Sequence, residues 1–490
     1  MEISPWSLPF NLLFTSMLIV VVLAADPYSK ALLSLKSQII DGSNSLDDWK
    51  VPPGETPSGK VHACSWSGVK CNKNSTIVVG LNLGMKNLAG ELLGNQLSVF
   101  TQLVELNVSQ NAFSGELPVE IFNLSKLTTL DISGNNFSGR FPNGITGLKK
   151  LVVLDALSNS FSGPLPVEVT ELESLKVLNL AGSYFDGEIP SSYGSFKSLE
   201  YLHLAGNSLT GKIPPELGKL KTVTHMEIGY NFYEGSIPWE LSNMTELQYL
   251  DIAGANLSGS IPKQLCNLSK LESLFLFRNQ FMGSIPWEFS QMVSLINLDL
   301  SDNLISGPIP ESFGELKKLK LLSLMFNEMN GTVPDTIAEL PSMETLFIWN
   351  NFFTGSLPEN LGRLSRLRWL DVSNNSFVGS IPPGVCAGEF NDAIKDELYK
   401  DIYNFGELIL EILTNGKVIK GGASIQSKPK DVVLRELYDE NEAGSTNSLQ
   451  EDEMKQVVDV ALLCTKSRAV DRPSIEDALK LLSGLKANGK

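Results

Sequence analysis

Apolar and polar residues repeat along this chain with a period of 24 residues over residues 80–388. In the repeat at 127–150, Leu130 and Ile132 alternate with polar residues, which is the pattern of a short strand with one buried face. Prolines recur at the same interval, at Pro118, Pro142, Pro166, Pro190, Pro214, Pro238, Pro262, Pro286, Pro310, Pro334, Pro358 and Pro382. A fixed period of this length is typical of solenoids, so the sequence predicts about 13 stacked coils that share one core.

A polar residue follows nearly every predicted strand at the turn. Asparagine occupies this place in most repeats, and Ser183 and Ala255 replace it in two. The asparagines are Asn111, Asn135, Asn159, Asn207, Asn231, Asn279, Asn303, Asn327, Asn351 and Asn375. An amide can hydrogen-bond to buried backbone of its own and the adjacent turn, and its loss would leave polar groups unpaired at about 1–3 kcal/mol each. We therefore expect a stabilising asparagine ladder with local weak points at Ser183 and Ala255.

The repeat "LTTLDISGNNFSGRFPNGITGLKK" matches the pattern LxxLxLxxNxLxGxIPxxLxxLxxL, which holds over about three hundred residues. This pattern resembles the plant-specific leucine-rich repeat. The resemblance implies an α/β solenoid, a right-handed leucine-rich-repeat superhelix with a parallel inner sheet. Residues 25–79 resemble the amino-terminal cap of plant leucine-rich-repeat receptor-like kinases, in which a helix around 31–40 covers the first repeat and Trp49 and Trp66 pack inside.

Composition restricts the partner class and the compartment. The net charge of −16 and the pI near 4.8 leave no basic stripe for a polyanion, so nucleic acid is not an expected partner. The apolar run at 12–25 is shorter than a membrane span and ends in small residues, which predicts a signal peptide at 1–24. No later apolar run reaches 18 residues, so we expect no membrane anchor in the chain as written.

Two cysteines support an oxidising compartment. Cys64 and Cys71 lie seven residues apart in "CSWSGVKC" and are predicted to form a disulfide. We therefore expect the secretory pathway and an extracellular location, with the plasma membrane as the location of full-length relatives.

N-glycosylation sequons fit this compartment, since none lies beyond residue 390. Asn107 and Asn374 also carry the sequon, but both are expected on the sheet face and are left out of the predicted acceptors. The predicted acceptors are Asn74, Asn123, Asn136, Asn243, Asn256, Asn267 and Asn330.

The regular period also shows which strand residues face outward on the inner sheet, where a solenoid would meet a ligand. From residue 201 onward, aromatic residues with Asp and Asn between them occupy positions that are expected to be polar. We predict a groove for an extended peptide, anchored by rings and bound through its backbone by carboxylates and amides. The alternative is that neighbouring rings only pack across strands. The predicted ligand-binding residues are Tyr201, His203, His225, Glu227, Tyr249, Asp251, Phe275, Phe277, Asp299, Phe347, Trp349 and Trp369.

Two of these residues, His203 and His225, could also suggest a metal site. With no Cys nearby, we interpret them as solvated, hydrogen-bonding residues. No metal and no other cofactor is expected.

Among plant receptors, the run of repeats resembles the branch that perceives CLE-type peptides, including the TDIF-receptor-like kinases. The resemblance implies a secreted peptide ligand on the inner face, held at its C-terminal carboxylate by an Arg-x-Arg pair. Arg366 and Arg368 lie outside the two outward strand columns, so this pair is not found here. A shorter leucine-rich-repeat co-receptor kinase is a further candidate partner.

The period stops after residue 388, and residues 389–490 carry a different pattern. "KDIYNFGELILEILTNGK" and "DRPSIEDALKLL" resemble helices of a plant receptor kinase, which implies an α-helical kinase large-lobe fragment. Phosphoryl transfer needs a Gly-rich loop, a VAIK-like Lys, an HRD Asp and a DFG Asp, and the sequence has none of them. We therefore expect no enzyme in the chain as written, whereas full-length relatives would be Ser/Thr kinases that use ATP. An alternative transcript, a pseudogene or a faulty gene model would explain the junction at 390–391.

The leading hypothesis is a receptor-derived ectodomain that recognises a secreted peptide or a co-receptor, without an anchor or a catalytic centre. One alternative is a secreted decoy that sequesters the ligand without signalling. Another is a polygalacturonase-inhibitor-type defence protein, which shares the repeat but is shorter and ends in a cysteine-bearing cap. The kinase-like tail disfavours this last alternative.

Overall fold

The computed structural model describes residues 26–51 and 60–385. The chain divides into two units, Met1–Pro382 and Pro383–Lys490, of which the first contains almost all of the described residues. The signal peptide predicted at 1–24 and the kinase fragment predicted at 389–490 lie outside the described residues.

The amino-terminal segment begins with a helix that starts earlier than the expected 31–40. Asp26 caps this helix, because its carboxylate accepts hydrogen bonds from the Ser29 backbone N–H at 2.9 Å and from the Ser29 hydroxyl at 2.7 Å. Ile40, expected to be helical, instead pairs with Ala89 in an antiparallel ladder. The elements of the segment are α2 (Pro27–Lys36), β1 (Ile40–Asp41), η1 (His62–Ser65), β2 (Val69–Cys71) and β3 (Val78–Asn82).

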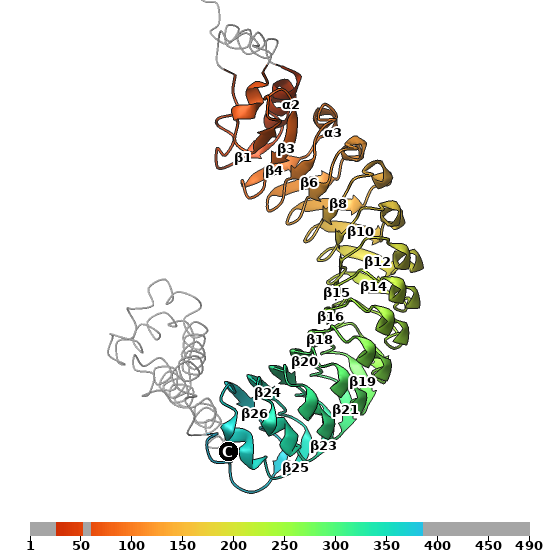
Figure 1. Ribbon diagram of the computed structural model, residues 1–490. Coiled ribbons are helices and arrows are strands. Elements are labelled where there is room, and N and C mark those ends of the chain that lie inside the picture. Colours follow the sequence, from red (N-terminus) through yellow and green to blue (C-terminus); the bar gives the residue numbers. More distant parts are fainter. Residues whose placement is uncertain (1–25, 52–59, 386–490) are drawn as a thin grey trace, which may run out of the picture. The chain divides into compact units, whose positions relative to one another are not determined.

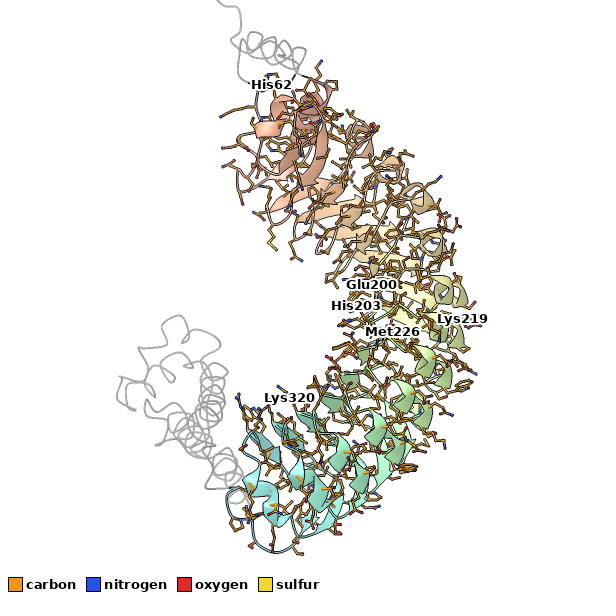
Figure 2. The ribbon with its side chains drawn as sticks, viewed as in Figure 1. His62, Glu200, His203, Lys219, Met226 and Lys320 are labelled. Carbon is orange, nitrogen blue, oxygen red and sulfur yellow. A yellow bond between two sulfur atoms is a disulfide. The ribbon has the colours of Figure 1, made fainter. Side chains whose placement is uncertain are left out.

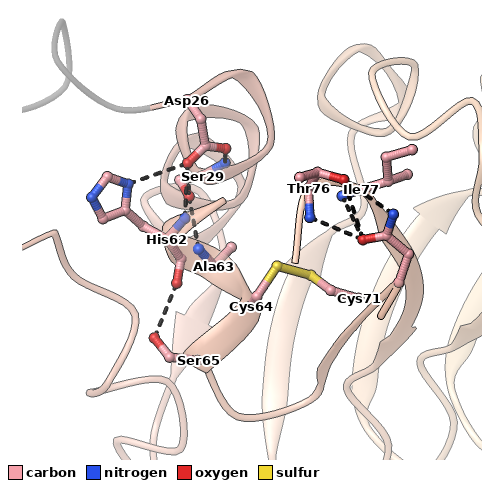
Figure 3. Close-up of a disulfide and its surroundings, with 10 residues drawn as sticks. Asp26, Ser29, His62, Ala63, Cys64, Ser65, Cys71, Thr76 and Ile77 are labelled. Atoms are coloured by element: carbon pink, nitrogen blue, oxygen red, sulfur yellow. Dashed lines mark hydrogen bonds and ion pairs between the residues drawn. A yellow bond between two sulfur atoms is a disulfide. The ribbon is translucent and has the colours of Figure 1, made fainter. Parts of the chain in front are cut away.

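A disulfide between Cys64 and Cys71 joins the 3₁₀ helix η1 to β2 (Figure 3). Next to it, Trp49 and Trp66 are buried and stack with ring centroids 5.7 Å apart. The Trp49 indole N–H also donates to the Ser67 carbonyl at 2.9 Å, so no polar atom of that ring is left unpaired. The segment thus forms an apolar cover over the first coil.

One long sheet runs through the described coils, in chain order and almost entirely parallel. Only its first pair, β2 with β3, is antiparallel. From β5 onward the paired residues lie 24 apart, as in Tyr201 opposite His225 and His225 opposite Tyr249. After β2 and β3, the strands are β5 (Glu105–Asn107), β7 (Thr129–Asp131), β9 (Val153–Asp155), β11 (Val177–Asn179), β13 (Tyr201–His203), β15 (His225–Glu227), β16 (Tyr249–Asp251), β18 (Ser273–Phe275), β20 (Asn297–Asp299), β22 (Leu321–Ser323), β24 (Thr345–Phe347) and β26 (Trp369–Asp371). The predicted solenoid with a parallel inner sheet is confirmed.

Short strands and 3₁₀ helices form the rest of each coil, and the helices lie on the side opposite the long sheet (Figure 1). The short strands are β4 (Leu88–Glu91), β6 (Ala112–Glu116), β8 (Asn136–Arg140), β10 (Ser160–Pro164), β12 (Tyr184–Glu188), β14 (Ser208–Thr210), β17 (Ser258–Gly259), β19 (Gln280–Gly283), β21 (Leu304–Gly307), β23 (Glu328–Gly331), β25 (Phe352–Gly355) and β27 (Ser376–Phe377). The helices are α3 (Gly94–Leu97), η2 (Val119–Asn123), η3 (Ile145–Gly147), η4 (Val167–Glu171), η5 (Ser191–Ser195), η6 (Pro215–Lys219), η7 (Trp239–Asn243), η8 (Lys263–Asn267), η9 (Trp287–Gln291), η10 (Glu311–Glu315), η11 (Asp335–Glu339) and η12 (Glu359–Arg363).

The core consists of layers, one from each coil. Leu130 and Ile132, the two strand residues predicted to point inward, are fully buried. Phe113, Phe137 and Phe161 stack in successive coils with centroids 6.4 and 6.5 Å apart. Because each layer is covered only by its neighbours, the coils depend on stacking for their stability.

The predicted asparagine ladder is present. The Asn303 amide donates to the carbonyls of Leu276, Leu300 and Ser301 at 3.0, 3.1 and 3.1 Å, and its oxygen accepts from the Phe281 N–H at 3.1 Å. One side chain therefore joins its own coil to the preceding one. The other ladder asparagines do the same, although the number of bonds varies, as at Asn207, which among the described residues donates to Leu180 and Leu204 only.

The two exceptions to the ladder are adapted differently. The Ser183 hydroxyl is buried and has no hydrogen-bond partner among the described residues. At Ala255 the backbone carbonyl accepts from the Tyr233 N–H at 3.1 Å, and the Asn256 amide donates to the Tyr233 carbonyl at 3.0 Å. The series of short strands is also interrupted here, since the sheet that ends at β14 and the one that begins at β17 are separate.

Candidate functional site

The structure places all of the predicted ligand-binding residues on the inner sheet or two residues beyond its strands. All are half-buried except Trp369, which is exposed. Figure 2 shows the arrangement in two neighbouring coils, where His203 lies on the inner side, Lys219 on the outer side and the buried Met226 of the next coil between them. The inner face therefore presents these side chains to solvent at the positions that the period predicts.

Five of these rings form one continuous row, which we call the aromatic ribbon: Tyr201, His225, Tyr249, Phe275 and Phe277. Successive ring centroids lie 6.0, 5.7, 5.5 and 6.5 Å apart. The His225 and Tyr249 rings are close to parallel, at an interplanar angle of 13°. These separations are typical of interacting aromatic pairs. The ribbon is thus in contact along its whole length while each ring is only half-buried.

A polar cluster lies at the amino-terminal end of the ribbon. The Tyr201 hydroxyl donates to the Glu227 carboxylate at 2.8 Å, and His203 Nε2 lies 3.6 Å from the other carboxylate oxygen. Burial lowers the pKa of His203, and the negative charges of Glu227 and Asp155 oppose this shift. Burial, together with the bond to Glu227, raises the pKa of Tyr201 well above its usual value of 10.0. The neutral forms of both rings are therefore favoured.

Each inner-face aspartate uses one oxygen within its own turn. Asp251 Oδ1 accepts from the Ala253 N–H at 2.8 Å, and Asp299 Oδ1 accepts from the Ser301 N–H and hydroxyl at 2.9 and 2.6 Å. The pKa of Asp251 is raised by burial and by the charges of Glu227 and Asp299. These carboxylates thus hydrogen-bond to the turns at the ends of their strands, and their remaining oxygens make the inner face acidic.

The last three predicted residues do not join the ribbon. Trp349 instead packs edge-on against Phe326, with centroids 4.3 Å apart. Phe347 and Trp369 follow in β24 and β26, three and four coils after Phe275 in β18. The inner face therefore carries a second aromatic patch further along the chain.

Sequence reasoning missed two aromatic residues, Tyr230 and Phe326. Both directly precede a ladder asparagine and have positive φ angles, 52° and 53°. The Tyr230 ring meets Phe277 at 6.4 Å, edge-on, and so extends the ribbon sideways. We call the position before each ladder asparagine, or before Ser183 and Ala255 where they replace it, the rim position. Its residues are Gln110, Gly134, Ser158, Gly182, Gly206, Tyr230, Gly254, Arg278, Asp302, Phe326, Asn350 and Asn374. The sequence did contain a signal for these two residues, because they are aromatic in a column that is otherwise rich in glycine and asparagine.

The other predicted features are placed as follows. All seven predicted glycosylation acceptors are exposed, whereas Asn107 is half-buried and its amide oxygen accepts from the Ser109 N–H at 2.9 Å.

Over residues 26–51 and 60–385, no cluster of three or more potential ligands is arranged for a metal ion. The same residues contain no helix with the length and hydropathy of a membrane span.

Family comparisons match the described part of the chain. The leucine-rich repeat N-terminal domain matches residues 29–72, and a leucine-rich repeat region matches 156–291. Single leucine-rich repeats match 102–124, 126–148, 294–316, 342–364 and 366–387. The chain therefore consists, over these residues, of a leucine-rich-repeat N-terminal domain followed by leucine-rich repeats.

Its relatives are plant leucine-rich-repeat receptor-like kinases, including TDR. The receptor-like protein kinase TDR of Arabidopsis thaliana is 47% identical over 115 residues, which cover 22% of this chain and 11% of the kinase. The putative leucine-rich-repeat receptor-like kinase At2g24130 of the same plant is 41% identical over 81 residues, 16% of this chain and 8% of the kinase. The chain thus matches about a tenth of the length of these relatives.

Solved ectodomains cover more of the chain. The crystal structure of a TDR receptor is 50% identical, with a TM-score of 0.62, and the match covers 63% of this chain and 53% of that one. The PEPR1–AtPEP1 structure is 31% identical, with a TM-score of 0.57 and coverage of 73% and 56%. The Arabidopsis HAESA structure, with the peptide hormone IDA and the co-receptor SERK1, is 32% identical, with a TM-score of 0.57 and coverage of 74% and 60%.

Proposed function

We propose that this chain recognises an extended secreted peptide on the inner face of its solenoid. The observation that carries the proposal is the aromatic ribbon, whose rings occupy solvent-facing positions over successive coils. Contacts between the rings order them in advance, so little conformational freedom is lost when a ligand covers them. The accessible parts of these half-buried rings supply the anchoring area that hot spots of protein interfaces use.

Charge on the inner face favours a particular kind of peptide. Glu227, Asp251 and Asp299 lie along the ribbon in β15, β16 and β20, and burial together with the charges of Glu227 and Asp299 raises the pKa of Asp251. A ligand with a free amino terminus or a basic side chain near these carboxylates would lower the repulsion among them. We therefore expect a peptide with positive charge over this part of the ribbon.

Similarity to solved receptors supports the same function. The related PEPR1 and HAESA structures are named as complexes with AtPEP1 and with IDA, and the HAESA complex also contains the co-receptor SERK1. A shorter leucine-rich-repeat co-receptor is accordingly part of the proposal. Entry into the secretory pathway, which such a ligand requires, remains a prediction from the sequence.

The test is a double substitution in the ribbon of the full chain. Tyr249→Ala with Phe275→Ala should weaken binding of synthetic CLE-type peptides at least tenfold in calorimetry and leave the melting temperature nearly unchanged. Tyr184→Ala is the matched control, because Tyr184 is a 62% exposed aromatic residue on the short strand β12, which is not part of the long inner sheet. A large drop in melting temperature would show instead that the ribbon is a packing feature. Unchanged peptide binding would refute the proposed site.

The proposal includes no phosphoryl transfer by this polypeptide. The sequence lacks the lysine, HRD and DFG motifs that position ATP, metal and the attacking hydroxyl. Incubation of the purified chain with radiolabelled ATP, Mg²⁺ and a general kinase substrate should transfer no label. Measurable transfer would contradict this part of the proposal.

A further inference from the structure

Two rim residues hold a backbone conformation that their side chains disfavour. Tyr230 and Phe326 have φ angles of 52° and 53°, in the left-handed region that bulky residues rarely adopt. Other coils place glycine at the rim position, as at Gly134, Gly182, Gly206 and Gly254. The solenoid itself therefore needs no ring at this position. Every rim position has a positive φ, from 50° to 67°, so the fold imposes this conformation and a bulky ring there carries strain that glycine would avoid. A strained side chain that the fold does not need is a sign of a functional constraint.

The surroundings of Tyr230 are shaped to accept its ring. The next rim residue is Gly254, and a Cβ atom there would stand 3.0 Å from Tyr230 Cδ1. Gly254 thus provides space for the Tyr230 ring, which also packs edge-on against Phe277 at 6.4 Å. The ring is held on one side, yet 47% of the Tyr230 surface is exposed.

Phe326 is held in a similar way four coils further on. Its ring packs edge-on against Trp349 at a centroid distance of 4.3 Å and an angle of 64°. Phe326 is 44% exposed, so part of its surface remains open to solvent. Both rim rings are therefore ordered by an inner-face ring and remain available to a partner.

The spacing of the two rings matches a short extended peptide. Four coils separate them, and neighbouring strands lie about 4.8 Å apart, so the rings are about 19 Å apart along the sheet. An extended chain rises about 3.3 Å per residue and covers this length in about six residues. Between the rings, Arg278 and Asp302 also occupy rim positions, with Nε 3.8 Å from Oδ2 and side chains 66% and 62% exposed.

We propose that Tyr230 and Phe326 determine which peptide is bound. They engage two apolar side chains about six residues apart in an extended peptide, and the Arg278–Asp302 pair contacts a polar residue between them. This inference rests on the proposed peptide-binding function and adds the spacing between two apolar side chains that the ligand must have.

Glycine substitution separates this role from a structural one. In the full chain, Tyr230→Gly and Phe326→Gly relieve the strained conformation, so the melting temperature should stay the same or rise. Peptide affinity should nevertheless fall at least tenfold in each variant, and Tyr230→Phe should retain it. Ser158→Gly is the matched control, because Ser158 has the same conformation, with φ 53°, at the rim three coils before Tyr230.

The probes are synthetic 12-residue peptides that each carry one lysine and two leucines, with the leucines two to nine residues apart. The wild-type chain should bind most tightly to the peptides with a separation of about six, and each glycine variant should lose this preference. If binding depends on Tyr249 and Phe275 but not on leucine spacing or on the rim rings, the present inference is wrong and the proposed function stands. If no peptide binds at any spacing, both are overturned.

Discussion

Removal of one ladder amide should destabilise the solenoid by an amount that the hydrogen bonds predict. Asn303→Ala deletes three donated bonds and one accepted bond. The three carbonyls each keep a second donor: the Asn279 amide for Leu276, the Asn327 amide for Leu300 and the Arg278 N–H for Ser301. Only the Phe281 N–H loses the acceptor that Asn303 supplies.

The expected loss of stability follows from this sharing. A stranded buried N–H costs about 1–3 kcal/mol, while a bond to a carbonyl that keeps another donor contributes at the low end of about 0.5–1.5 kcal/mol. We therefore expect Asn303→Ala to lower the free energy of unfolding by about 3 kcal/mol. This value is well below the sum for four independently stranded groups.

Urea denaturation followed by tryptophan fluorescence measures the change, and Asn143→Ala is the control, because Asn143 is exposed. The reverse substitution is available in the same ladder. Ser183→Asn should raise the stability by about 1 kcal/mol, because it replaces a buried hydroxyl without a described partner by the amide that most coils use. If Asn303→Ala costs less than about 0.5 kcal/mol, or if Ser183→Asn is strongly destabilising, the account of the ladder is wrong.

Three further predictions concern the inner face. The pKa of His203 is lowered below 6.5 in the folded state, so its contribution to stability is complete above pH 6.5 and declines as the pH falls toward the folded-state pKa. His203→Gln should therefore reduce the loss of melting temperature between about pH 7 and pH 5. Because the pKa of Asp251 is raised, its charge opposes folding at neutral pH, and Asp251→Asn should raise the melting temperature at pH 7 but not at pH 3. Gly254→Ala should lower the melting temperature of the protein more than Gly187→Ala, because both glycines have positive φ but only Gly254 faces the Tyr230 ring. Equal effects of the two substitutions would exclude that contact.

Most of the fold follows from the period of the sequence. A short strand like the one that contains Leu130 and Ile132 recurs every 24 residues, with a polar turn after it. Each coil therefore has an apolar face that only a neighbouring coil can cover. The same period determines the register of the long sheet, since residues 24 apart lie opposite each other. For this reason the inner-face columns, including Tyr201 and Tyr249, could be located from the sequence.

The first residue of the amino-terminal helix was harder to predict from the sequence. Its apolar residues are compatible with 31–40, but the bond from the Ser29 N–H to Asp26 begins the helix at Pro27. A capping residue is only identifiable once the chain around it has a conformation. The pairing of Ile40 with β4 likewise depends on a strand nearly fifty residues later in the chain.

The sequence by itself determined the solenoid, the asparagine ladder and the face that carries the aromatic residues, because each depends on a fixed interval along one chain. Tertiary structure decided which of those residues touch: the ribbon from Tyr201 to Phe277, the separate Phe326–Trp349 pair and the cluster around Glu227. It also decided the left-handed rim conformation of Tyr230, since the sign of φ leaves no trace in a hydrophobic pattern. Contacts between rings depend on side-chain direction across coils, and that direction exists only when the coils are stacked.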